Sequence, residues 1–126
     1  MKHLILTITL CSLSSVANAF ERENFYNKKY CAELGGIYSS YHNNTGATNA
    51  SIDCETEDTA WEGEWSYKAY EAVGQSLWYA SITGKTPGII FYVKKKNQQK
   101  YIDRAKLTFD SLNIKYRIKV INLLEQ

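Results

Sequence analysis

The chain has 126 residues, of which 44% are apolar and 22% are charged, and its formal net charge is +2. This is the composition of an ordinary folded protein, and the length allows one hydrophobic core but not two. The composition excludes a low-complexity chain, and only one proline, Pro87, interrupts the sequence.

The first 19 residues show the pattern of an export signal. Lys2 and His3 precede a short apolar stretch over residues 4–10, and Ala17-Asn18-Ala19 supplies the small residues that a signal peptidase recognises. The apolar stretch is far shorter than the roughly 20 residues that a membrane span needs, and a retained N-terminal anchor is the alternative. We therefore expect a signal peptide over residues 1–19 and an exported chain, periplasmic or secreted, with no membrane span after it.

The mature chain, residues 20–126, is expected to form a single domain. It retains two cysteines, Cys31 and Cys54, separated by 22 residues. An even pair of cysteines in an exported chain suggests a disulfide. A bond across a loop of this length stabilises the fold by about 3 kcal/mol. The alternative, a pair of metal ligands, lacks both the CxxC spacing and a nearby histidine.

Hydrophobic periodicity and turn residues divide the mature chain into helices and strands. Gly35-Gly36 and Gly84 follow two of the predicted helices, as is common at helix ends. Three consecutive strands followed by crossover helices predict a mixed sheet flanked by helices, in the α/β or α+β class. The predicted elements are a helix over 21–34, strands over 37–41, 51–56 and 60–65, a helix over 68–83, a strand over 88–93, a helix over 100–112 and a strand over 118–123, with a loop over 43–49.

The two longest predicted helices have recognisable faces. In the helix over 68–83, a polar stripe recurs at intervals of three and four residues and is too polar for a core face; a solvated helix face is the alternative. The last predicted helix is amphipathic. The polar stripe consists of Lys68, Glu71, Gln75 and Tyr79, the apolar side of the same helix of Tyr70, Val73, Leu77, Trp78 and Ala80, and the inward side of the last helix of Ile102, Ala105, Leu107, Phe109 and Leu112.

Charge is sorted along the chain, although the net charge is small. Seven acidic residues and one basic residue lie between Asp53 and Glu71, whereas ten basic and two acidic residues lie between Lys85 and Lys119. An acidic cluster beside a basic half is suited to holding a divalent metal next to a phosphate-binding surface. The alternative is that both are solvated faces.

The two strands over 51–56 and 60–65 are predicted to form an acidic hairpin. Residues that lie directly opposite in an antiparallel pair point to the same face, where like charges repel unless they are compensated. Mg²⁺ or Mn²⁺ would compensate carboxylates; the alternative is an acidic face screened by water. The acidic face would hold Asp53, Glu55, Glu62 and Glu64, and the opposite face Ile52, Cys54, Trp61 and Trp65.

An Asp on one strand, an acidic residue on the next, a Lys, and Gln-x-x-x-Tyr on a helix resemble the PD-(D/E)XK nuclease superfamily. The segment Gln75–Tyr79 is similar to the helix motif of the nuclease domains in bacterial recombination helicase–nucleases. Residues 31–120 also resemble a family of small exported bacterial proteins of unknown role, most specifically over 74–80. The resemblance implies a restriction-endonuclease-like αβββαβ core, followed here by an extra helix and strand.

The resemblance also implies roles for individual residues in hydrolysing a phosphodiester bond of DNA or RNA. Mg²⁺ or Mn²⁺ would be held by Asp53 and Glu62, and Glu64 belongs to the same acidic set at the position where the superfamily has its lysine. Lys68 would be a migrated lysine that assists the nucleophile or the phosphate. The candidate catalytic residues are Asp53, Glu62, Glu64, Lys68, Gln75 and Tyr79, of which the three acids are candidate metal ligands, and the candidate phosphate-backbone contacts are Lys94, Lys95, Lys96 and Lys100.

The departure from the family pattern keeps other hypotheses open, because Glu62-Gly63-Glu64 is not Glu-x-Lys. The first hypothesis is an exported metal-dependent nuclease. The second is a catalytically inactive, nuclease-like secreted binding protein. The third is a disulfide-stabilised secreted domain whose acidic face has only a structural role.

Overall fold

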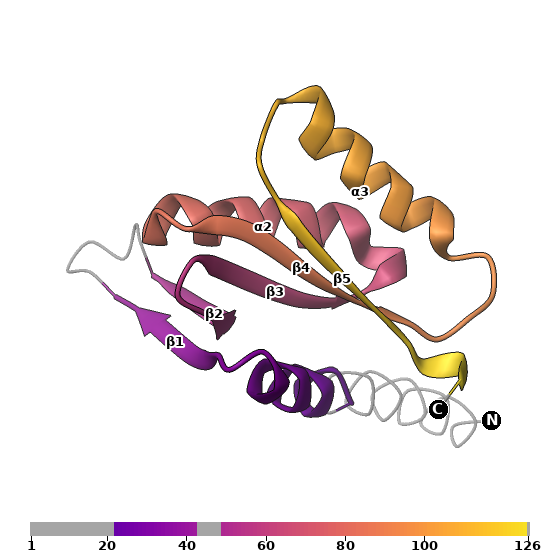
Figure 1. The fold of residues 1–126 in the computed structure, drawn as a ribbon, viewed down its shortest axis with the longest axis horizontal. Coiled ribbons are helices and arrows are strands. Elements are labelled where there is room, and N and C mark those ends of the chain that lie inside the picture. Colours follow the sequence, from indigo (N-terminus) through magenta and orange to yellow (C-terminus); the bar gives the residue numbers. More distant parts are fainter. Residues whose placement is uncertain (1–21, 43–48, 126) are drawn as a thin grey trace, which may run out of the picture.

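The computed structural model describes residues 22–42 and 49–125. The predicted signal peptide, residues 1–19, and most of the predicted loop over 43–49 lie outside the described residues. Within the described residues the chain forms one five-stranded mixed sheet with helices packed against it (Figure 1). The predicted mixed sheet flanked by helices is therefore confirmed.

The sheet has the strand order β1-β2-β3-β4-β5, which is also the order in the sequence. β1, β2 and β3 pair antiparallel, whereas β3 with β4 and β4 with β5 are parallel. Each parallel pair needs a crossover connection, and α2 and α3 provide the two crossovers. The elements are an N-terminal helix over residues 22–33, β1 (Ile37–Tyr41), β2 (Ala50–Glu55), β3 (Thr59–Trp65), a 3-10 turn (Ser66–Lys68), α2 (Ala69–Thr83), β4 (Thr86–Val93), α3 (Gln99–Ser111), β5 (Arg117–Asn122) and a 3-10 turn (Leu123–Glu125).

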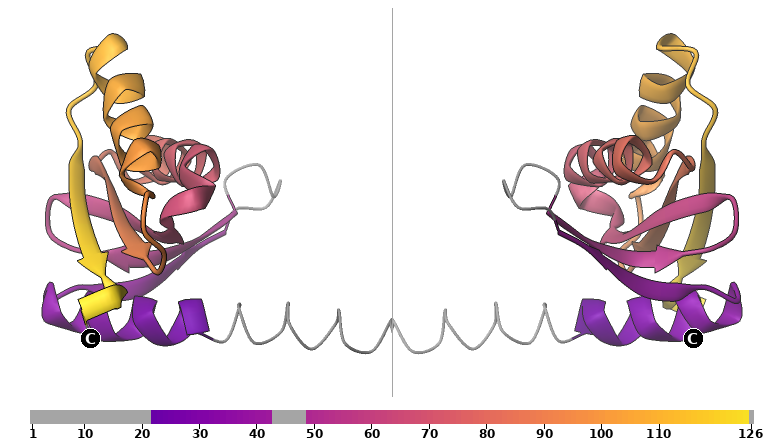
Figure 2. Two further views of the ribbon diagram at one scale, coloured as in Figure 1. Left: turned by 90° about the vertical axis from the view of Figure 1, so that its right-hand side faces the viewer. Right: turned by 90° about the vertical axis from the view of Figure 1, so that its left-hand side faces the viewer.

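Hydrophobic clusters lie on both faces of the sheet. On one face, α2 and α3 cover a cluster centred on Ile89, Phe91 and Phe109. On the other, the N-terminal helix covers a largely aromatic cluster that contains Trp65 and Tyr92, and the side views in Figure 2 show this helix across the sheet from α2 and α3. None of the helices that the structure describes is long and apolar enough to cross a bilayer.

Over the described residues, the predicted strands and helices agree with the observed bounds to within two residues, and the predicted start of the first helix at residue 21 lies outside them. The predicted helix faces agree less well. On α2, Tyr70 and Trp78 are exposed, and the buried side is formed by small residues together with Tyr79. Leu107 on α3 and Leu112, which follows that helix, are exposed, because Ile102, Ala105 and Phe109 form the narrow buried stripe that packs with α2 and β4. Both corrections have one cause. Each helix contacts its neighbours along a strip that is narrower than the helix face its apolar residues cover.

A β-bulge in β2 changes which residues face the acidic side of the sheet. Between Ile37 opposite Glu55 and Ser39 opposite Ile52, β2 has one residue more than β1. An extra residue reverses the alternation of side chains beyond it. Ile52 consequently packs with Ala60 and Tyr79, and not with Cys54 and Trp61. The predicted placement of Ile52 beside Cys54 was therefore wrong.

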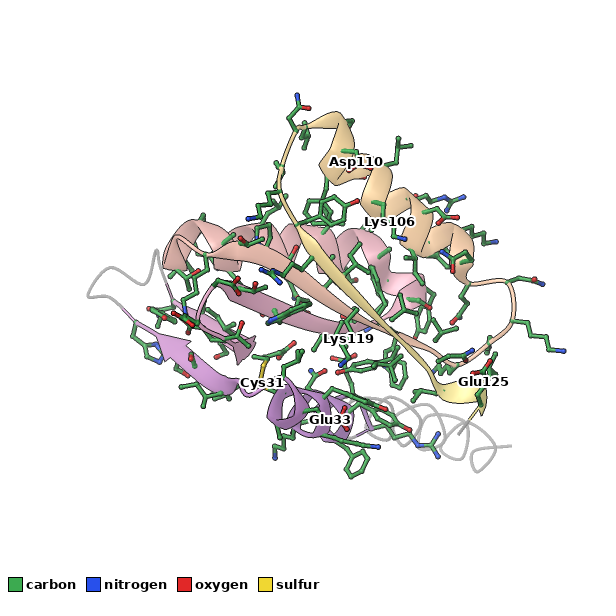
Figure 3. All side chains as sticks on the ribbon, viewed as in Figure 1. Cys31, Glu33, Lys106, Asp110, Lys119 and Glu125 are labelled. Atoms are coloured by element: carbon green, nitrogen blue, oxygen red, sulfur yellow. A yellow bond between two sulfur atoms is a disulfide. The ribbon has the colours of Figure 1, made fainter. Side chains whose placement is uncertain are left out.

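The disulfide predicted between Cys31 and Cys54 is present, with a Cα–Cα distance of 5.3 Å. It joins the end of the N-terminal helix to β2, next to Asp53 in the sequence (Figure 3). Gly36 lies against it, since a Cβ added at Gly36 would collide with the Sγ atom of Cys54 and lie 3.0 Å from that of Cys31. The bond thus fixes the helix against the strand that carries the first acidic residue of the candidate site.

Candidate functional site

Four of the predicted site residues meet at the buried carboxyl group of Glu62 on β3, which is 3% exposed. The Glu62 carboxyl donates a hydrogen bond to the Asp53 carboxylate from β2. From α2, the Tyr79 hydroxyl donates to Glu62, and the Gln75 amide nitrogen, when turned toward it, donates to Oε2 at 3.2 Å. Sequence spacing placed Gln75 and Tyr79 on one stripe of the helix, and the structure directs that stripe at Glu62.

Asp53 occupies the bulge of β2, where its carboxylate turns toward β3. Its Oδ2 accepts a hydrogen bond from the backbone N–H of Gly63 at 3.0 Å. The observed pairing of β2 with β3 covers Cys54 with Trp61 and Glu55 with Ala60. The Asp53 side chain therefore supplies the acceptor for an N–H of β3 just beyond the paired residues.

Glu64, two residues after Glu62 on β3, forms a second pair of carboxyl groups with Glu23 of the N-terminal helix. Glu64 accepts a hydrogen bond from its neighbour's backbone, Trp65 N, at 2.8 Å, and another from the carboxyl group of Glu23 in the N-terminal helix. The Lys68 ammonium lies 3.8 Å from Glu64 Oε1. Lys68 thus reaches the acidic residues, as predicted, but it pairs with Glu64. We call Glu23, Asp53, Glu62 and Glu64 the carboxyl cluster.

Burial and mutual repulsion hold protons on this cluster. Desolvation, followed by the charge of Asp53 and the hydrogen bond to it, raises the pKa of Glu62 to about 10. Desolvation and the hydrogen bond to Glu64 raise the pKa of Glu23 to about 8. Burial also raises the pKa of Asp53, although the Gly63 N–H and Glu62 oppose the rise. At neutral pH the Glu62 carboxyl therefore keeps its proton, which it donates in the hydrogen bond to Asp53.

On the sheet face covered by the N-terminal helix, two hydrogen bonds fix the backbone of β3 at the carboxyl cluster. The Tyr92 hydroxyl donates to Asn27 Oδ1 at 2.6 Å, and Asn27 Nδ2 donates to the Gly63 carbonyl at 3.4 Å. All three residues are buried. Gly63 must be a glycine here, because a Cβ would overlap Asn27 and lie 2.9 Å from the Tyr92 hydroxyl. The peptide between Glu62 and Glu64 is therefore held on both sides.

Basic residues adjoin the Glu64 end of the cluster. The Lys94 ammonium lies 4.2 Å from the ring centroid of Trp65 and 5.6 Å from that of Tyr67. Burial and the neighbouring cations Lys95, Arg22 and Lys68 lower the pKa of Lys94. The loop that carries Lys94 is tied to the start of the 3-10 turn, where Ser66 Oγ donates to buried Gln98 Oε1 at 2.8 Å.

The other candidate phosphate contacts are placed less closely. Lys95 and Lys96 are exposed in the same loop, and Lys100 is exposed on α3 with its ammonium 5.2 Å from the Tyr101 ring centroid. Glu55, predicted on the acidic face, pairs with the Lys85 ammonium at 2.9 Å and accepts a hydrogen bond from the Tyr41 hydroxyl at 2.9 Å. Glu55 therefore forms a separate ion pair with Lys85 and does not belong to the carboxyl cluster.

Glu23 is the site residue that sequence reasoning missed. It comes from the N-terminal helix, about 40 residues before Glu64, and no motif or spacing links the two. The available signal was the predicted disulfide, which brings that helix to β2. Over residues 22–42 and 49–125, no three Asp, Glu, His or Cys side chains converge closely enough to enclose a metal ion.

Comparison of the chain with protein-family models, with curated proteins and with solved structures finds no match.

Proposed function

We propose that this protein is an exported, metal-dependent nuclease whose reaction centre is the Asp53–Glu62 pair. The observation that carries the proposal is the convergence of Asp53, Gln75 and Tyr79 on the buried carboxyl of Glu62. A purely structural acidic face would be solvated, whereas Glu62 is 3% exposed and surrounded by polar partners. Strongly perturbed carboxyl groups clustered at one place are typical of functional sites.

The Asp53–Glu62 pair fits Mg²⁺ or Mn²⁺ better than the full predicted set of three acids. Mg²⁺ keeps several waters and is commonly held by only one or two carboxylates. The two hydrogen-bonded carboxyl groups supply those oxygens once the Glu62 proton leaves, whereas Glu64 is engaged by Lys68 and Glu23. A bound ion would supply a Lewis acid for water and for the phosphoryl group.

The residues around the pair have separable roles in the proposed reaction. Gln75 and Tyr79, both donors to Glu62, orient its carboxyl group and hold the charge that appears when its proton leaves. Lys68 stands at the Glu64 end of the cluster, near enough to pair with a phosphate oxygen of a substrate lying along β3. Lys94 adds a second cation there, fixed over Trp65.

The strand order and directions support the resemblance to PD-(D/E)XK nucleases. Three antiparallel strands, a crossover helix and a parallel strand follow the N-terminal helix in the αβββαβ order that the resemblance implies. A further helix and strand come after it, as expected from the sequence.

A cleavage assay tests the proposal. The protein is produced by secretion with its disulfide formed, and is incubated with single-stranded DNA, plasmid and RNA in Mg²⁺ or Mn²⁺. We expect cleavage that stops with EDTA and in Asp53→Asn, in which the amide oxygen still accepts from Gly63 N–H. Glu57→Gln, which alters an exposed acid in the hairpin turn, is the matched control and should retain activity.

Two results would overturn the proposal. One is the absence of cleavage with either metal on all three substrates. The other is cleavage that survives both EDTA and Asp53→Asn, which would indicate a contaminating enzyme. Either result would favour the second hypothesis, a nuclease-like secreted binding protein.

A further inference from the structure

A pocket of about 590 Å³ lies between the N-terminal helix and strands β1 and β2, beside the carboxyl cluster. This volume is within the range of small-molecule sites, roughly 300–1,000 Å³. None of the roles assigned to the carboxyl cluster or to the basic loop uses this pocket. Asp53 and Glu23 belong both to its lining and to the carboxyl cluster.

The walls of the pocket combine an aromatic ring, an apolar surface and hydrogen-bonding groups. Cys31, Ala32 and Gly36 supply the apolar surface, beside the disulfide. Tyr38 supplies the ring, and its side chain is 63% exposed although it belongs to a strand. Asn24 and Lys28 add polar groups from the helix. A flat ring with a hydrogen-bonding edge, such as a nucleobase, matches this combination.

The bulge in β2 is what places Tyr38 at the reaction centre. Ile37 lies opposite Glu55 and Ser39 opposite Ile52, so Tyr38 lies across from Asp53 and Cys54. Ser40 Oγ donates to the Tyr38 hydroxyl at 3.3 Å. A base stacked on Tyr38 would therefore have its sugar and phosphate next to Asp53.

We propose that this pocket receives one unpaired nucleotide of a single-stranded nucleic acid, whose phosphate lies at the Asp53–Glu62 pair. The inference rests on the proposed function and names its substrate class. A base in a duplex is stacked and paired, and it must leave the helix before it can enter a pocket between a helix and a strand. Aromatic stacking beside cations is the usual means of holding single strands. Lys68 and Lys94 lie beside the Glu64–Glu23 pair, where the next phosphate would be.

Fluorescence anisotropy of a labelled hexathymidylate tests the inference, with EDTA present so that metal-dependent cleavage is silent. We expect Tyr38→Ala to weaken binding about fivefold or more, at the lower end of what one stacked base contributes. Tyr38→Phe should bind as the wild type does. Phe25→Ala is the matched control, because Phe25 is also 63% exposed and aromatic but lies outside the pocket lining.

Equal binding by Tyr38→Ala and Phe25→Ala would overturn the inference, as would tighter binding of a duplex of the same sequence than of the single strand. The cleavage assay separates this failure from that of the proposed function. Cleavage that needs metal and Asp53 but not Tyr38 would support the proposed nuclease and exclude a role for the pocket. Tyr38-dependent binding without any cleavage would exclude the proposed nuclease activity and support a pocket that binds single strands.

Discussion

The Asp53 carboxylate on β2 accepts a hydrogen bond from the backbone N–H of Gly63 on β3 at 3.0 Å. The pairing of these two strands ends at Cys54 with Trp61, so Asp53 lies one residue and Gly63 two residues beyond the last paired residues. An aspartate side chain thus satisfies a main-chain donor of β3 near the point where the bulged strand departs from it. The same carboxylate accepts from Glu62, so the geometry of the backbone and the chemistry of the site depend on one group.

Replacing Gly63 by alanine should destabilise the protein by about 2–3 kcal/mol, the cost typical of overpacking a filled interior. The added Cβ would overlap Asn27 Oδ1 and crowd the Tyr92 hydroxyl, which breaks the hydrogen bond between those two side chains. Urea denaturation monitored by tryptophan fluorescence measures the change in the free energy of unfolding.

Gly74→Ala is the control for that prediction, because it makes the same chemical change in open space. No atom lies within 4 Å of a Cβ added at Gly74, in the exposed middle of α2. Alanine there should stabilise the protein by about 0.5–1 kcal/mol, since glycine is the poorer helix former. Loss of stability in both variants, or in neither, would contradict the packing around Gly63.

The buried Glu62 carboxyl should make the metal-free protein less stable as pH rises. Its pKa of about 10 in the folded state lies above the ordinary value of 4.5, so the folded chain holds a proton that the unfolded chain releases. The stabilisation from this proton is complete below pH 4.5 and is lost progressively up to pH 10, at no more than about 1.4 kcal/mol per pH unit. Melting temperatures from pH 5 to 9 in EDTA give the slope.

Glu62→Gln tests the origin of this slope, because glutamine retains the size of the side chain and does not titrate. The variant should lose part of the pH dependence up to pH 8, where Glu23 with its pKa of about 8 still titrates, lose most of it above pH 8, and be more stable than the wild type at pH 9. Glu57→Gln, at an exposed position in the hairpin turn, should leave the slope unchanged. An unaltered slope in Glu62→Gln would show that another group titrates.

The sequence allowed the order and bounds of the elements to be predicted, because alternating strands, glycine-terminated helices and a nearly continuous apolar β4 are local signals. It also allowed the stripe that carries Gln75 and Tyr79 to be identified. Two features of the site are not local. The bulge that turns Ile52 to the opposite face arises from pairing with β1, and a one-residue change in pairing is not visible in β2 alone.

The position of Glu23 could not be predicted for a similar reason. Its contact with Glu64 depends on how the N-terminal helix packs on Trp65 and Tyr92, through a cluster in which Tyr26 and Tyr30 take part. Tertiary packing of this kind has no periodicity in the sequence. The exposure of Tyr70 and Trp78 has the same origin, since a helix buries only the strip that its neighbours reach.

The disulfide should contribute about 3 kcal/mol to stability through the loop it closes. The double variant Cys31→Ala/Cys54→Ala should lose that amount in urea denaturation, and it should also bind single strands more weakly, because the disulfide fixes the helix that carries Glu23 to β2. Reductant should shift the wild type toward the variant and leave the variant unchanged. Equal sensitivity of both proteins to reductant would contradict this account.

Binding of Mn²⁺ should release a proton, because the Asp53–Glu62 pair holds one at neutral pH and the metal needs ionised carboxylates. Affinity should accordingly rise with pH, approaching about tenfold per pH unit between pH 6 and 8, where Glu62 remains below its pKa of about 10. Calorimetric titrations in two buffers of different ionisation enthalpy measure the proton release.

Asp53→Asn and Glu62→Gln should each abolish binding of Mn²⁺. Glu55→Gln alters a carboxyl that pairs with Lys85 away from the cluster, and it should bind as the wild type does. If Glu64→Gln abolished binding while Asp53→Asn did not, the metal would belong at the Glu64 end of the cluster, and the proposed division of labour between the two carboxyl pairs would be reversed.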